Sequence, residues 1–297
     1  MANNTDYLTP AEMMVEAEHY ASSKTKKSTG TILGLGMMAG LFIGLAFVFY
    51  ITVTTGSSDI PWGLAKLAGG IAFSLGLILV VICGGELFTS SVLTIIARAN
   101  KEINTSQMLS IWGKVYVGNF FGAMFLLVLV MAAGLYSGAH GQWGLNALNI
   151  AQHKLHHTFI QAFALGILCN LLVCLAVWLT FSSKNAATKA LMTILPVALF
   201  VSSGFEHCVA NMFMVPLGIA IQTFAPDTFW HAVGTDASQY ADLTISHFVF
   251  ANLIPVTLGN IVGGAFFVGL ANWFIFSHPY QKKETPVNHT EVIENKA

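Results

Sequence analysis

LFVSSGFEHCVAN, residues 199–211, is the stretch that decides the fold of this chain. It lies in the middle of an apolar run from about residue 190 to residue 224, which would be ~52 Å long as one helix. A bilayer core is about 30 Å thick and needs about 20 helical residues, so we expect a break in this run. Ser202, Ser203 and Gly204 would relax the backbone there and offer hydroxyls to the freed backbone groups. An ionisable side chain at membrane depth is costly and indicates function, which makes His207 the expected centre of the site.

The composition is that of a membrane protein. The 297 residues are 55% apolar and only 9% charged, whereas about 25% of the residues in soluble domains are charged. The net charge of −1 gives no indication of a nucleic-acid partner. Cys83, Cys169, Cys174 and Cys208 all lie in apolar runs, so a secreted disulfide framework is not expected.

We expect three regions along the chain. Residues 1–29 form a cytoplasmic segment with a short amphipathic helix, which a Thr9–Glu12 capping box starts and which ends near Ser22. This helix is either a surface anchor or a gating plug. Residues 30–277 form a six-helix transmembrane domain, with apolar spans near 31–53, 65–97, 107–135, 159–181, 190–224 and 248–276. Residues 278–297 are expected to be a disordered cytoplasmic tail. If the spans alternate, most lysines and arginines fall on one side, which places both termini in the cytoplasm.

The two halves of the chain repeat each other. GGEL at residues 84–87 in the second span parallels GFEH at 204–207 in the fifth, and GNFFG at 118–122 parallels GNIVG at 259–263. Because each half has three spans, the halves insert in opposite orientations. Inverted repeats with interrupted spans at matching positions predict a binding site near the membrane midplane.

Each break would create a helix N-terminus at membrane depth, one after Thr89 and one after His207. Such an end carries roughly half a positive charge and free N–H groups, which favours a small anion. His207 adds a group that titrates at about pH 6.5 in model peptides, and Thr89 could bond either the imidazole or a substrate oxygen. For Glu86 and Glu206 we expect a structural role, accepting from the unpaired N–H groups of the breaks. A proton or ion role is the alternative.

Lys154 lies among histidines in a connecting segment that also holds His140, His153, His156 and His157. The segment lacks the His-Glu-x-x-His arrangement of a zinc site, so we expect no metal there. It would instead give a vestibule a positive potential, or form a solvated loop. No cofactor is expected.

The chain resembles the formate–nitrite transporter family from about Pro10 to Ile275. VICGGELFTS at residues 81–90 looks like the first family signature and GILCNLLVCLA at 166–176 like the second. Within the family, FVFYIT at 47–52, GQWGLN at 141–146 and NLIPVT at 252–257 look most like formate channels. Where such channels often have an Ala-Asp pair, this chain has Gly85-Glu86, so its carboxylate is one methylene longer.

The resemblance implies an all-α, aquaporin-like fold of six transmembrane helices in two inverted three-helix repeats, with helices two and five broken, assembled as a homopentamer in the lipid bilayer. It implies a substrate pathway through His207, Thr89, Asn170, Leu87, Phe73, Leu77, Phe200, Val173, Phe88 and Lys154. Supporting residues would be Glu206, Asn211, Asn260 and Glu86. A cytoplasmic formate-producing enzyme is a candidate partner of the N-terminal segment.

We therefore expect passive, bidirectional and pH-sensitive passage of formate across the bacterial inner membrane, by a protein that is not an enzyme. A nitrite or hydrosulfide channel of the same fold is the alternative, because these anions resemble formate in size and charge. An intramembrane hydrolase using Ser202, Ser203 and His207 is disfavoured, since no nucleophile elbow is present. A neutral-solute channel is disfavoured because no span has an arginine at its centre to exclude ions.

Overall fold

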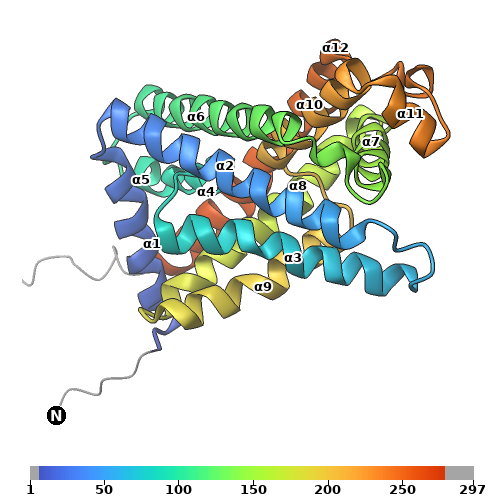
Figure 1. Ribbon diagram of the computed structural model, residues 1–297. Coiled ribbons are helices and arrows are strands. Elements are labelled where there is room, and N and C mark those ends of the chain that lie inside the picture. Colours follow the sequence, from blue (N-terminus) through green and yellow to red (C-terminus); the bar gives the residue numbers. More distant parts are fainter. Residues whose placement is uncertain (1–6, 278–297) are drawn as a thin grey trace, which may run out of the picture.

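The computed structural model describes residues 7–277, and these residues form helices joined by short connections (Figure 1). The predicted disordered tail, 278–297, lies outside the described residues. In chain order the α-helices are α1 (Pro10–Thr25), α2 (Thr29–Thr54), α3 (Trp62–Cys83), α4 (Phe88–Ser91), α5 (Ile95–Ala99), α6 (Thr105–Ala132), α7 (Gln142–Leu155), α8 (Phe159–Leu179), α9 (Ala186–Ser202), α10 (Cys208–Phe224), α11 (Asp227–Val233), α12 (Ile245–His247) and α13 (Ile254–Ile261). The last span also contains π-helical stretches at Phe248–Leu253, Val262–Leu270 and Trp273–Ser277.

Five helices of the described chain are long and apolar enough to cross a membrane. The expected second and fifth spans are interrupted, as the sequence predicts. The second divides into α3 and the shorter apolar stretch Phe88–Ala99, and the fifth divides into α9 and α10. The second half-helix of the first pair begins at Phe88, so the prediction that it follows Thr89 is wrong by two residues.

The predicted end of the N-terminal helix near Ser22 is also wrong. The Thr9–Glu12 capping box forms as expected, but α1 continues to Thr25 and buries Lys24. The continuation brings the lysines of this segment against the membrane domain.

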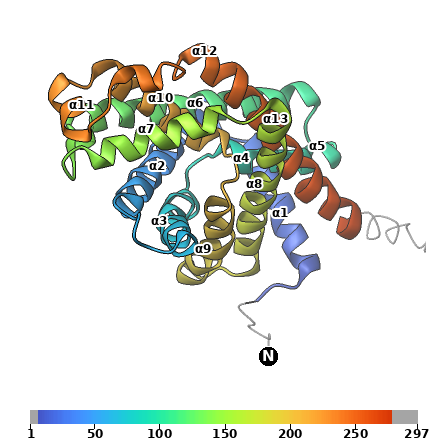
Figure 2. The same cartoon turned by 90° about the vertical axis from the view of Figure 1, so that its right-hand side faces the viewer.

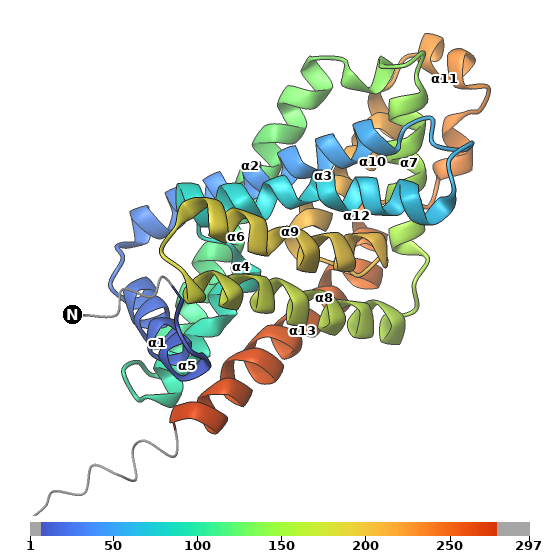
Figure 3. The ribbon, with the colours of Figure 1, turned by 90° about the horizontal axis from the view of Figure 1, so that it is seen from below.

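The two halves pack by the same scheme. α2 lies along α6, α8 lies along α13, and α3 of the first half lies along α9 of the second (Figures 1 and 3). α4 lies in the middle of this arrangement when the molecule is viewed from its side (Figure 2). α1 and α5 lie at one end of the bundle and α7 and α11 at the other, and we call these the near and far ends (Figure 1).

Glycine allows the close helix approaches within each half. The backbones of Gly36 and Gly118 meet where α2 crosses α6, and those of Gly166 and Gly259 meet where α8 crosses α13. A side chain at Gly122 would collide with the carbonyl oxygen of Met37, which is backbone and cannot rotate away. At these glycines the small side chain therefore permits close packing of the two helices.

Replacing Gly122 by alanine is expected to lower the melting temperature of the detergent-solubilised protein by several degrees, because α2 and α6 must move apart. Gly113→Ala is the matched control on the same helix, since a β-carbon there meets no atom within 4 Å. That control should be neutral or slightly stabilising, because alanine favours the helix. Equal melting temperatures for the two variants would contradict the packing argument.

Candidate functional site

Each interrupted span turns at a glycine in the left-handed region. Gly84 has φ 85° at the end of α3, and Gly204 has φ 73° at the end of α9. Residues other than glycine avoid this conformation, which explains why the two breaks carry the repeated glycines. The chain then runs without helical bonding for a few residues before α4 and α10 begin.

Two asparagines hold the breaks in the same way. The side-chain oxygen of Asn119 accepts the N–H of Phe88 at 2.9 Å, and its amide nitrogen donates to the carbonyls of Gly36 and Glu86, both at 2.8 Å. Asn260 repeats this in the second half. It accepts the N–H of Cys208 at 2.9 Å and donates to the carbonyls of Gly166 and Glu206, at 2.8 and 2.9 Å. One amide side chain therefore satisfies three backbone groups that would otherwise be unpaired in an apolar medium.

This correspondence confirms the internal repeat at the level of individual bonds. The backbone N–H of Glu86 also donates to the carbonyl of Leu35 at 3.0 Å, and that of Glu206 donates to Leu165 at 3.3 Å. The sequence prediction of free N–H groups at the helix ends needs correction, because the first N–H of each half-helix is bound by an asparagine. The dipole of each half-helix still favours a negative charge in front of its first turn.

The two half-helices meet at His207 and Thr89. The imidazole Nε2 lies 3.0 Å from the Thr89 hydroxyl, and both side chains are buried. The imidazole Nδ1 accepts the backbone N–H of Ala210 at 3.1 Å, so His207 is the N-cap of α10. A neutral imidazole with an accepting Nδ1 has its proton on Nε2, and this N–H donates to the Thr89 oxygen. The hydroxyl hydrogen of Thr89 then points away from His207 and is available to another acceptor.

Further contacts fix the threonine. The amide nitrogen of Asn170 donates to the Thr89 carbonyl at 3.0 Å and to the Asn260 carbonyl at 2.6 Å. The Cys174 thiol donates to the same Thr89 carbonyl at 3.2 Å. Asn170 thus ties the threonine of the first half to the capping asparagine of the second.

The two glutamates form buried ion pairs, and the prediction that they accept from backbone N–H groups is wrong. Glu86 pairs with Lys24 and Lys27 of the N-terminal segment. Glu206 pairs with Lys154 of α7 at 2.8 Å. In both repeats the carboxylate beside the break is neutralised by a lysine from outside the two broken spans.

Glu206 is held by amides as well. Asn211 donates to its Oε2 at 2.6 Å and to the side-chain oxygen of Asn252 at 2.7 Å, and Asn252 donates to the same Oε2 at 3.1 Å. Of the residues expected to support the site, Asn211 and Asn260 therefore contact Glu206 at the second break, whereas Glu86 lies at the first break. Asn252 was not predicted, and only its place in the NLIPVT stretch could have indicated it.

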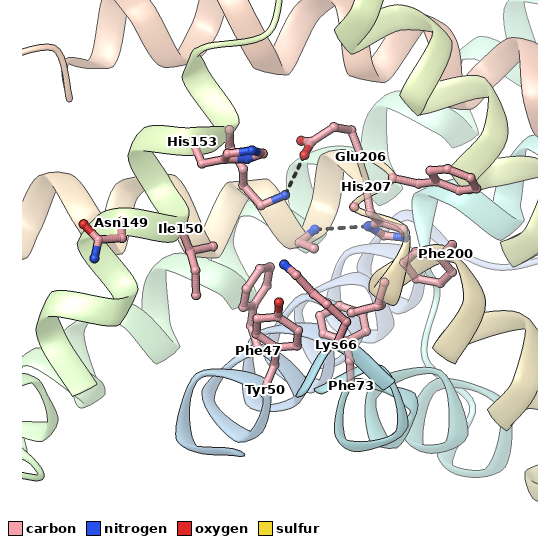
Figure 4. Close-up of a pocket in the computed structure, with 15 residues that line it drawn as sticks. Phe47, Tyr50, Lys66, Phe73, Asn149, Ile150, His153, Phe200, Glu206 and His207 are labelled. Carbon is pink, nitrogen blue, oxygen red and sulfur yellow. Dashed lines mark hydrogen bonds and ion pairs between the residues drawn. The ribbon is translucent and has the colours of Figure 1, made fainter. Parts of the chain in front are cut away.

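A cavity of about 270 Å³, which we call the far vestibule, opens beside His207 on the side of α7 (Figure 4). Phe73 and Phe200 form its floor with their rings 6.0 Å apart, and the Phe200 ring is stacked 6.1 Å from the imidazole. Lys154 and Glu206 line it, as do Lys66 and His153 (Figure 4). Burial lowers the pKa of His153, as do its neighbours His157 and Lys154, so His153 is neutral near pH 7.

A second cavity, of about 210 Å³, lies at the near end beside α1, and we call it the near vestibule. It is lined by Glu86 with Lys24 and Lys27, and by Val80 of α3 and Val177 of α8. Between the vestibules the same helices carry Leu77 and Val173, each about one turn away from these lining residues, and both are buried. Leu87 and Phe88 are also buried, the latter against the Tyr116 ring.

Two polar vestibules on either side of an apolar neck with one imidazole–hydroxyl pair define a class of protein. A multi-pass helical protein with discontinuous spans meeting at a central polar site is a membrane channel or transporter. The comparisons with known proteins give the family. A family model described as "Formate/nitrite transporter" matches residues 11–274, and the chain belongs to this family.

Similar proteins cover nearly the whole chain. This chain is 52% identical over 274 residues to the formate channel FocA of Escherichia coli, and the alignment covers 92% of this chain and 96% of the relative. It is 53% identical over 263 residues to FocA of Haemophilus influenzae, covering 89% and 93%. A solved structure described as a pentameric formate channel with formate bound has a TM-score of 0.81 and 56% identity, covering 85% of this chain and 99% of that one. Another, an FNT family ion channel, has a TM-score of 0.74 and 26% identity, covering 89% and 98%.

Replacing Asn260 by leucine is expected to cost about 1–3 kcal/mol for each backbone group left unpaired, and to abolish a defined break in the fifth span. Asn272→Leu is the control on the same span, because within residues 7–277 the amide of Asn272 bonds only the carbonyl of Val268 on its own helix. Size-exclusion chromatography of each variant during denaturation in detergent measures the difference in stability between them. An Asn260→Leu protein as stable as Asn272→Leu would contradict the capping role.

Proposed function

We propose that this protein conducts formate passively, and in both directions, across the bacterial inner membrane. The observation that carries the proposal is the buried His207–Thr89 pair between two vestibules, at the meeting of two half-helix N-termini. The similarity to proteins named formate channels, including a structure with formate bound, supports the choice of substrate.

The main obstacle for formate is its charge in the apolar neck. An anion loses most of its hydration there, and an isolated carboxylate in such a medium is very costly. The dipoles of α4 and α10 offset part of this cost, and the free hydroxyl hydrogen of Thr89 supplies one directed bond to a carboxylate oxygen. Since the part of the chain that the structure describes places no fixed cation in the neck itself, the anion is attracted without being trapped. Fast release requires such weak binding.

The remaining pathway residues follow from their positions. Lys154 would attract anions into the far vestibule. Phe73 and Phe200, which form the floor of this vestibule, would narrow the pathway there. Leu77, Leu87, Phe88 and Val173 would line the neck toward the near vestibule, and Asn170 would hold Thr89 in place. Glu86, Glu206, Asn211 and Asn260 would support the two breaks.

Acid would change transport through His207. Protonating Nδ1 removes the lone pair that accepts the Ala210 N–H, so charging the imidazole must break the N-cap of α10. A charged imidazole would hold formate more tightly or pass its proton to it, converting the anion into neutral formic acid at the barrier. Either result makes formate movement depend on pH.

The distribution of basic residues and the similarity to known channels indicate how the protein is oriented and assembled. The near end carries Arg98, Lys101, Lys184 and Lys189 as well as Lys24 and Lys27, and an excess of basic residues marks the cytoplasmic side. We infer that both termini lie in the cytoplasm and that five copies assemble as in the pentameric relative. The N-terminal segment would then face the cytoplasm, where an enzyme that produces formate could dock.

Nitrite and hydrosulfide remain the alternative substrates on the same fold. Neither the half-helix dipoles nor the Thr89 hydroxyl distinguishes one small monovalent anion from another. Flux into liposomes loaded with buffer, measured for formate, nitrite, hydrosulfide, acetate and chloride, decides between them. We expect the largest permeability for formate and a much smaller one for chloride, which cannot accept the Thr89 hydrogen in the same geometry. A larger nitrite permeability would replace formate as the substrate.

Replacing His207 by asparagine is expected to leave a conducting protein whose formate flux no longer changes between pH 7.5 and pH 5. In the wild type the flux should change severalfold over the same range. His156→Asn is the control, because His156 is exposed at the far end and, among the described residues, pairs only with Asp242. If His207→Asn kept the wild-type pH profile, a role of the imidazole in pH sensitivity would be excluded.

A further inference from the structure

Two vestibule lysines take no part in the ion pairs at the breaks. Lys24 and Lys27 are bound to Glu86, and Lys154 is bound to Glu206. Lys66 lines the far vestibule and Lys189 the near vestibule, and neither has an ion-pair partner within residues 7–277. Their charge is therefore not cancelled locally.

Lys66 sits at a junction between two cavities. It lines the far vestibule and also a cavity of about 330 Å³ further toward the end of the molecule, which Ser57, Ser58 and Asn146 make polar. Its side chain extends into the vestibule toward Phe47 and Tyr50 (Figure 4). The ammonium lies 6.0 Å from the centre of the Trp62 ring, a weak cation–π contact that leaves it free to move.

Lys189 lies close to the position that corresponds to Lys66 in the inverted repeat. Lys66 lies in the first turns of α3, 18 residues before the turn glycine Gly84 (84 − 66). Lys189 lies in the first turn of α9, 15 residues before the turn glycine Gly204 (204 − 189). The two positions differ by three residues, less than one helical turn, so they occupy similar faces of the two half-helices.

The charge of each vestibule depends on these lysines. The far vestibule is lined by two lysines and one carboxylate, Glu206, and its neighbour His153 is neutral at pH 7 because burial lowers its pKa. The near vestibule is lined by three lysines and one carboxylate, Glu86. Without Lys66 the charged residues that line the far vestibule would have no net charge. Without Lys189 the near vestibule would lose half of its excess positive charge.

We propose that Lys66 and Lys189 are the anion-capture residues of the far and near vestibules, one for each direction of entry. A half-buried ammonium in a cleft with apolar walls raises the local concentration of a small monovalent anion before it reaches the neck. Because neither lysine is held by a carboxylate, each can accompany the anion and release it. This inference rests on the proposed function, since it assigns a role in anion entry.

The test replaces charge at a fixed position. Lys66→Cys and Lys189→Cys are prepared separately on a Cys83→Ser background, because Cys83 is the exposed cysteine and the other three are buried. Each purified variant is labelled in detergent with a cationic trimethylammonium or an anionic sulfonate methanethiosulfonate and then reconstituted. Initial formate flux is measured at low formate concentration, in low salt and in about 1 M salt.

We expect each unlabelled variant to conduct formate about threefold more slowly than the background protein in low salt. The cationic label should restore most of the flux, and the anionic label should lower it further. High salt should remove the differences, since screening shortens the reach of a charge to about 3 Å. Lys184→Cys, which alters an exposed lysine five residues before Lys189, is the control and should respond to neither label.

Equal effects of the two labels, or no effect of either, would overturn the capture role. Lys66→Met and Lys66→Arg give a second comparison if a cysteine variant does not fold, and only the methionine should lower the flux. Should the background protein pass no formate, the proposed substrate is wrong. The same comparison with nitrite then tests the lysines separately.

Discussion

The structure depends on the requirement that backbone N–H and carbonyl groups in a hydrocarbon environment have partners. A span that breaks at membrane depth exposes several such groups at once, and water is not there to bind them. Asn119 and Asn260 resolve this for the two breaks, because one amide offers an acceptor and two donors in a fixed arrangement. Once these amides are in place, the half-helices can end facing each other.

The same constraint connects structure to function. A helix that begins at membrane depth presents its positive end to whatever lies in front of it, and the asparagines make such a beginning stable. The buried glutamates then need cations, and the lysines of α1 and α7 supply them from the two ends of the molecule. Each break is consequently tied to an element at a membrane surface, α1 at the near end and α7 at the far end. Removing one partner of such a buried pair typically costs about 3–5 kcal/mol, so neither element is a passive cover.

Much of this architecture could be predicted from the sequence because membrane thickness limits helix length so strictly. Two apolar runs were too long for one crossing, and both contained glycine with a glutamate, so the breaks and the repeat could be located. Thr89 and His207 could be placed together because the repeat requires the two ends to meet. The family resemblance added the apolar neck residues, which have no distinguishing local pattern.

The partners of the charged groups could not be predicted. Periodicity does not show that α1 folds back so that Lys24 reaches Glu86, because that contact joins residues 62 positions apart. Lys154 was expected to face a vestibule, but its pairing with Glu206 depends on how α7 is placed over the second break. The sequence does not set Lys66 apart, because a lysine near the end of a span usually extends to the membrane interface.

The two repeats are unequal in a way that bears on how such a protein can diversify. From the glutamate of the break to the capping asparagine there are 33 residues in the first half (119 − 86) and 54 in the second (260 − 206). α11 and the turn after it lie within the longer interval, where Phe229 packs beside Gly144 of α7 at the far end. The additional chain therefore lies outside the contacts that define the centre. Insertions and deletions at this end can alter one entrance without disturbing the contacts between the two breaks, so the residues that meet an approaching molecule can change while the interior stays the same.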